Sequence, residues 1–170
     1  CSIRRNKPDD RLHRPRPATP EPEHRPALSV CTEQLPLDSP MLRSIHHAAI
    51  ICSDYAVSKR FYSETLGLAV LAEHYRESRQ SYKLDLALPD GGQIELFSFP
   101  DAPPRPSRPE AQGLRHLAFA VDDVAACKAQ LEAKGVAVEP IRVDEYTGRR
   151  FTFFADPDGL PLELYEKASR

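Results

Sequence analysis

Apolar and polar residues alternate along two stretches of the chain, and the same succession of elements occurs in both. In the first stretch the pattern predicts a strand over 45–52 and then a helix that begins after Asp54. Three strand-like runs follow, over 69–75, 82–88 and 93–99. This stretch therefore predicts one strand, one helix and three more strands, in that order.

The second stretch repeats this order. A strand is predicted over 114–121, a helix after Asp122 or Asp123, and strands over 136–143, 150–154 and 161–165. Matching positions are 68 or 69 residues apart, and an internal repeat of this size predicts two similar modules packed together. The expected fold class is α+β, with two βαβββ modules.

The composition divides the chain further. Residues 1–40 hold 8 of the 17 prolines and 13 charged residues, so we expect a disordered leader there. Met41 is the only methionine, and one hypothesis is that translation starts there; the alternative is an ordinary flexible extension. We expect a folded domain over 41–170, with module one at 42–99, a linker containing five prolines at 100–112, and module two at 113–167.

Two histidines and two glutamates occupy matching positions of the two modules. His47 and His116 lie on the first strand of each module, and Glu95 and Glu163 lie on the last. Side-chain alternation directs all four to the face that does not pack on a helix. A carboxylate in such a strand is costly to desolvate unless it is paired or binds a metal.

Imidazole and carboxylate ligands together suit Ni²⁺, Zn²⁺, Co²⁺, Mn²⁺ or Fe²⁺. A site with four protein ligands leaves positions for water or substrate, as catalytic metal sites do. The alternative is that each glutamate pairs with an arginine, such as Arg115 or Arg150, and that each histidine is a core residue.

Several short motifs, weak singly but specific in their order, resemble the vicinal oxygen chelate superfamily, which includes glyoxalase I, bleomycin-resistance proteins and extradiol dioxygenases. The resemblance covers about 42–167 and is greatest to bacterial glyoxalase I. The motifs are His46-His47-Ala48-Ala49-Ile50, Arg60-Phe61-Tyr62, Leu66-Gly67, Ile94-Glu95-Leu96, Arg115-His116-Leu117-Ala118-Phe119, Asp156-Pro157-Asp158-Gly159 and Leu162-Glu163-Leu164.

The resemblance implies a U-shaped mixed sheet around one divalent metal ion, with His47, Glu95, His116 and Glu163 as ligands. It implies a lactoylglutathione lyase-like reaction, in which a hemithioacetal is isomerised by proton transfer through an enediolate. Glu163 would be the catalytic base, and Glu95 a second acid or base. The alternatives are an epimerase or isomerase of an acyl-CoA or related carbonyl substrate, and a binding protein that sequesters a ligand without chemistry.

Charge and cysteine content narrow the partners and the location. The formal net charge of -2 argues against nucleic acid, and no apolar run reaches the ~20 residues that cross a membrane. The cysteines lack a disulfide-type spacing, so we expect reduced thiols and a cytoplasmic protein.

We expect the substrate to be an anionic small molecule, such as a thiol conjugate, because arginines suit the binding of anionic groups. The candidate substrate-binding residues are Arg105, Arg108 and Arg150, with Arg149 beside the last. The alternative is that each is a solvated surface charge. In this superfamily a site can be built within one chain or across two, and we expect a homodimer.

Overall fold

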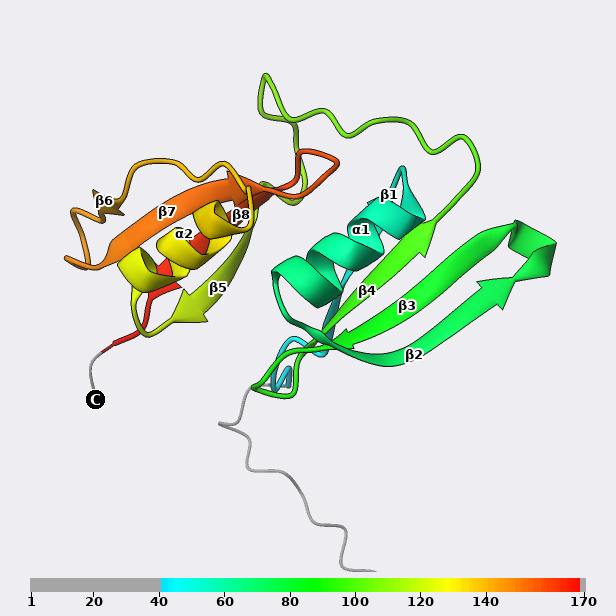
Figure 1. The fold of residues 1–170 in the computed structure, drawn as a ribbon, viewed down its shortest axis with the longest axis horizontal. Helices are drawn as coiled ribbons and strands as arrows, with labels where there is room; N and C mark the ends of the chain where they lie inside the picture. The colour runs from blue at the N-terminus through cyan, green and yellow to red at the C-terminus, as the bar shows by residue number, and fades with distance from the viewer. Residues whose placement is uncertain (1–40, 169–170) are drawn as a thin grey trace, which may run out of the picture. The chain divides into compact units, whose positions relative to one another are not determined.

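The computed structural model describes residues 41–168, so the predicted leader over 1–40 lies outside the described residues. Figure 1 shows the elements in chain order. The first module contains β1 (His47–Cys52), α1 (Tyr55–Arg60), the π-helical turn η1 (Phe61–Thr65), β2 (Ala69–Arg76), the 3₁₀ turn η2 (Glu77–Arg79), β3 (Ser81–Ala87) and β4 (Gln93–Ser98). The second contains β5 (Leu117–Val121), α2 (Val124–Ala133), β6 (Arg142–Val143), β7 (Arg150–Ala155) and β8 (Pro161–Glu166).

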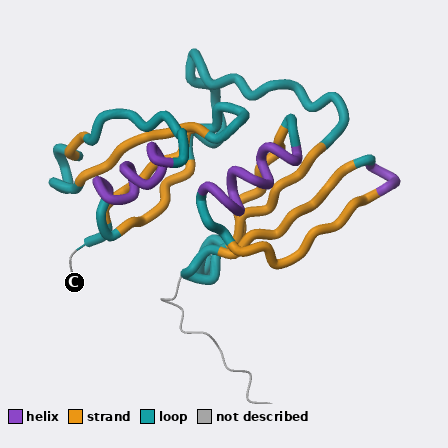
Figure 2. Tube along the Cα trace, in the orientation of Figure 1, coloured by secondary structure: helices purple, strands orange, loops and turns teal. Residues whose placement is uncertain are grey.

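Each module forms a four-stranded mixed sheet with the same topology. The strand orders are β1-β4-β3-β2 and β5-β8-β7-β6. The first strand of each module pairs in parallel with the last, and the remaining pairs are antiparallel. Figure 2 shows the helices, strands and loops of both modules by colour. The α+β class and the two βαβββ modules are confirmed.

Both helices begin where the sequence predicts. Asp54 is the N-cap of α1, and its carboxylate accepts a hydrogen bond from the Val57 backbone N–H at 3.0 Å. Asp123 caps α2 and accepts from two backbone N–H groups, those of Ala125 and Ala126. The residues that cap the helix starts are therefore equivalent in the two modules.

One predicted strand is much shorter in the structure. Within the expected strand 136–143 only Arg142–Val143 forms β6, and Val138 makes one isolated bridge to Phe154. Pro140 interrupts this run and has no backbone N–H to donate to a sheet. The carbonyl of Glu139 instead accepts a hydrogen bond from the Thr152 hydroxyl at 2.7 Å.

The core lies on the helix-covered faces of the two sheets. Its buried residues come from both modules: Ile50, Tyr62, Leu84, Leu86, Ile94, Leu96, Val124, Leu131, Phe154, Leu160, Leu162 and Leu164. Tyr62 is fully buried and donates its hydroxyl proton to Asp156, from the other module, at 3.0 Å. Burial, together with the negative charge of Asp156, raises the pKa of Tyr62 far above its ordinary value.

Candidate metal-binding pairs

The face of each sheet opposite its helix, here called the open face, carries the predicted ligands. On β1, Ile50 and Cys52 are buried while His47 is exposed, so His47 lies on the open face as the alternation predicts. Register places Glu95 of β4 beside Ala49 of β1 and thus on the same face as His47. On the second sheet Glu163 of β8 is likewise registered with Ala118 of β5.

His47 and Glu95 form the first pair. Nε2 of His47 lies 3.7 Å from Oε2 of Glu95. The Glu95 side chain is 14% exposed, whereas that of His47 is 42% exposed. The other carboxylate oxygen of Glu95 accepts a hydrogen bond from Lys83 at 3.0 Å. The first pair therefore contains a shielded carboxylate with an ammonium beside it.

His116 and Glu163 form the second pair. Nε2 of His116 lies 3.0 Å from Oε2 of Glu163, whose side chain is 11% exposed. The ring of Phe153 packs edge-to-face with the His116 ring, with centroids 5.2 Å apart. Phe153 is also the cross-strand neighbour of Glu163. The second pair therefore lies against an aromatic side chain.

The donor set of the two pairs fits a divalent metal. Each pair offers an imidazole nitrogen and a carboxylate oxygen, a mixture that Ni²⁺, Zn²⁺, Co²⁺, Mn²⁺ and Fe²⁺ accept. Nδ1 of His116 is buried and has no hydrogen-bond partner within 41–168. In the described part of the chain, no group of three or more His, Cys, Asp or Glu side chains is close enough to hold a metal. The predicted four residues thus occur as two separate pairs.

The pairing of each glutamate with an arginine is not what the structure shows. Arg115 binds Glu110, with Nη1 and Oε1 3.2 Å apart. Arg150 binds Glu166. The cation beside Glu95 is Lys83, on the neighbouring strand β3.

The predicted arginines lie in three different environments. Arg108 lines a cavity of about 410 Å³ that also contains His116 and Phe153. Arg105 lines a second cavity, of about 550 Å³, and donates to the backbone carbonyl of Leu114 at 3.1 Å. Only Arg108 therefore shares a cavity with a predicted metal ligand.

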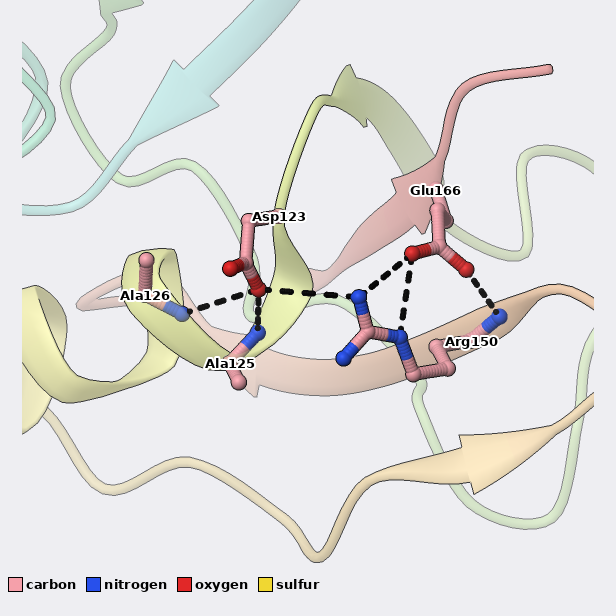
Figure 3. Close-up of polar contacts among 5 residues, drawn as sticks. All are labelled: Asp123, Ala125, Ala126, Arg150 and Glu166. Carbon is pink, nitrogen blue, oxygen red and sulfur yellow. Dashed lines mark hydrogen bonds and ion pairs between the residues drawn. The ribbon is translucent and has the colours of Figure 1, made fainter. Parts of the chain in front are cut away.

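Arg150 lies on the opposite side of the second sheet. Its neighbour Phe151 is on the open face, so Arg150 points to the helix-covered side. Figure 3 shows its guanidinium between Glu166 and Asp123, the N-cap of α2. The Arg150 Nε and Nη2 atoms both donate to Glu166, at 3.0 and 2.6 Å. This placement argues against contact between Arg150 and a molecule held by Glu163, and it indicates a structural role.

Sequence reasoning missed Lys83 and Asp85. Both lie on β3, alternate with buried Leu84 and Leu86, and therefore share the open face with Glu95. Charged residues at every second position of a strand are the signal that could have identified them. Phe153 was missed because an aromatic residue in a strand is typical of any sheet.

Cys52 and Cys127 are the two cysteines in the described part of the chain. Both are free. Burial raises the pKa of the Cys52 thiol to about 11. Among residues 41–168, no helix has the length and apolar character needed to cross a membrane.

Comparisons with known proteins agree with this fold. The uncharacterized protein YaeR of Escherichia coli is 64% identical over 126 residues, which are 74% of this chain and 98% of that protein. The crystal structure of a glyoxalase family protein from Enterococcus faecalis is 50% identical with a TM-score of 0.69, covering 73% of this chain and 98% of the other.

A more distant solved structure is that of TnmS3, an antibiotic binding protein from Streptomyces sp. CB03234. It is 29% identical with a TM-score of 0.58, and the match covers 76% of this chain and all of that chain. The family model described as glyoxalase/bleomycin resistance protein/dioxygenase superfamily matches residues 44–164, and the chain therefore belongs to this superfamily.

Proposed function

We propose that the chain is a metal-dependent enzyme of the glyoxalase I type, which isomerises a small substrate by moving a proton between adjacent carbons. The observation that carries the proposal is the presence of a His–Glu pair at equivalent places in both modules. The superfamily includes enzymes such as glyoxalase I as well as non-catalytic members, and its members commonly use a divalent metal.

His47, Glu95, His116 and Glu163 would together hold the ion. When bound, the ion would stabilise negative charge on two neighbouring substrate oxygens. Glu163 would take the proton from one carbon and return it to the next. The apolar ring of Phe153 beside this pair would limit access of water during the transfer.

We further propose that the four residues come together between two copies of the chain. The two modules of one chain share the core on their helix-covered faces, through contacts such as Tyr62–Asp156. The open faces with the two pairs are the opposite faces of these sheets. The first pair of one copy would then meet the second pair of another, in a homodimer with two sites.

The substrate of this proposal is an anionic small molecule such as a thiol conjugate. Arg108 supports it, because it lines the cavity that contains His116 and no ion-pair partner of Arg108 occurs within 41–168. Arg115 and Arg142 line the same cavity but are paired with Glu110 and Glu139. An epimerase acting beside an acyl-CoA carbonyl would use the same two pairs.

A binding protein without chemistry is the second candidate, favoured by the similarity to the antibiotic binding protein TnmS3. Metal content and turnover separate the two. An enzyme of the proposed type should bind about one Ni²⁺, Zn²⁺ or Co²⁺ per chain and convert a member of a panel of hemithioacetals and acyl-CoA thioesters. His47→Ala and His116→Ala should each lose most of the metal, since each removes a ligand. Stoichiometric ligand binding with neither metal nor turnover would contradict the proposal and support the binding protein.

A further inference from the structure

Lys83 places an ammonium against one of the two glutamates and has no counterpart at the other. Asp85 on β3 is the cross-strand partner of Glu95, and Lys83 lies two residues earlier on the same face. The Lys83 Nζ donates to Oε1 of Glu95 at 3.0 Å and also to Asp85. The Lys83 side chain is only 27% exposed, so these contacts are partly shielded from water.

The two oxygens of Glu95 consequently have different surroundings. Oε1 is engaged by Lys83, whereas Oε2 faces Nε2 of His47 at 3.7 Å. A hydrogen bond to one oxygen restricts rotation of the carboxylate and fixes the direction of the other oxygen. That other oxygen is the one beside the histidine of the same pair.

The second pair lacks this arrangement. The residue equivalent to Lys83, 68 positions later, is Phe151, and the residue equivalent to Asp85 is Phe153. Within the described range, the polar side-chain partner of Glu163 is His116. Glu163 is thus free of the ammonium that restrains Glu95.

We propose that Lys83 is a positioning residue, which keeps Glu95 fixed as a ligand while Glu163 is the glutamate that moves. Asp85 in turn holds the Lys83 ammonium in place. This inference rests on the proposed metal site, because it assigns different tasks to two of its four ligands.

Cobalt binding by the full chain tests the inference without any substrate. Co²⁺ is titrated into metal-free wild type, Lys83→Met, Lys83→Arg and the double variant Lys83→Met/Asp85→Asn, and both the dissociation constant and the visible absorption spectrum are recorded. Loss of a residue that orients a ligand commonly costs about 10–100-fold in metal affinity. We expect that loss and an altered spectrum for Lys83→Met, and most of the wild-type affinity for Lys83→Arg.

The double variant distinguishes the orientation of Glu95 by Lys83 from the effect of leaving the Asp85 charge unpaired. If Lys83 acts by orienting Glu95, the double variant binds Co²⁺ as weakly as Lys83→Met. If it binds as tightly as wild type, the loss in Lys83→Met came from the unpaired Asp85, and the inference is overturned.

If Lys83→Met has wild-type affinity and a wild-type spectrum, the positioning role of Lys83 is also overturned. In that case the proposed metal site is still supported if His116→Ala loses Co²⁺. A wild-type chain that binds no Co²⁺ overturns both the role of Lys83 and the proposed metal site. Melting temperatures of the metal-free variants show whether each one is folded.

Discussion

The two modules have the same topology and place a His–Glu pair at the same positions, yet the neighbours of the two pairs differ in kind. On the first sheet, Glu95 lies beside Asp85 and accepts a hydrogen bond from Lys83. On the second sheet, Phe153 is the neighbour of Glu163 and packs on His116. A repeated backbone therefore provides equivalent His–Glu pairs, and the adjacent strand makes their surroundings chemically unequal.

This inequality suggests a division of tasks. A carboxylate that accepts a hydrogen bond from an ammonium is restrained, which suits a permanent ligand. A carboxylate beside an aromatic ring is less restrained and is shielded from water, which suits proton transfer. The difference cannot be read from the two His–Glu pairs alone, because they are identical in residue type.

Substitution of each glutamate by glutamine tests whether Glu95 and Glu163 have different tasks, and it should have the largest effect. Glu163→Gln should lower kcat by about 10²–10⁴-fold, the usual contribution of a general acid or base, and retain bound metal. Glu95→Gln should lower metal affinity and have the smaller effect on kcat of the metal-saturated enzyme. The measurement is steady-state kinetics with a hemithioacetal, alongside metal analysis. Equal losses of kcat would show that the two glutamates share the proton transfer.

The contact between the two modules includes a buried polar group, the carboxylate of Asp156. Asp156 accepts from the Tyr62 hydroxyl and from two backbone N–H groups, at Asp158 and Leu160. Asp156→Ala leaves these donors unsatisfied and should lower the free energy of unfolding by about 3 kcal/mol. Asp156→Asn keeps an acceptor for the N–H groups and should cost much less. Chemical denaturation measures both, and equal stabilities for Ala and Asn would contradict the role of these hydrogen bonds.

The pKa of Asp156 gives this contact a pH signature. Burial raises the pKa of its carboxyl above the ordinary 3.8. The folded chain then keeps the proton to higher pH than the unfolded chain. This residue's contribution to the free energy of unfolding therefore falls as pH rises from the ordinary pKa of 3.8 through the raised pKa of the folded chain. Asp156→Asn should remove this component from the pH dependence of the unfolding free energy. An unchanged pH profile in the Asn variant would contradict a raised pKa.

Arg108 of the linker and Arg150 of the second module provide a smaller test. Arg108→Ala should raise KM for an anionic substrate by about tenfold with little change in kcat, because a charged hydrogen bond to a remote group binds ground and transition states alike. Arg150→Ala is the matched control, since its guanidinium is bound to Glu166 on the other face of the sheet. It should lower the melting temperature and leave KM unchanged. A raised KM in Arg150→Ala would show that Arg150 contacts the substrate.

Much of the fold could be predicted because its signals are local. The caps Asp54 and Asp123 and the alternation around Ile50 and Leu96 each depend on a few adjacent residues. The short β6 could not be placed as readily, since Pro140 interrupts the strand-like run over 136–143.

The candidate site was predictable in residue type but not in arrangement. Sequence spacing relates Glu95 to His47 but carries no information on which cation lies beside Glu95, which depends on the register of β3 with β4. Nor could the sequence show that Arg108 shares a cavity with His116 while Arg150 binds Glu166 on the helix-covered side of the second sheet.

A mixed dimer of two inactive variants tests whether two chains each contribute one His–Glu pair to a site. His47→Ala and Glu163→Ala chains are co-expressed with different tags, and the heterodimer is isolated for metal analysis and turnover. If pairs are shared between chains, one of its two sites contains no substitution, and we expect about half of the wild-type metal and activity. If each site is built within one chain, both sites carry a substitution. A heterodimer as inactive as either variant alone would therefore show that pairs are not shared between chains.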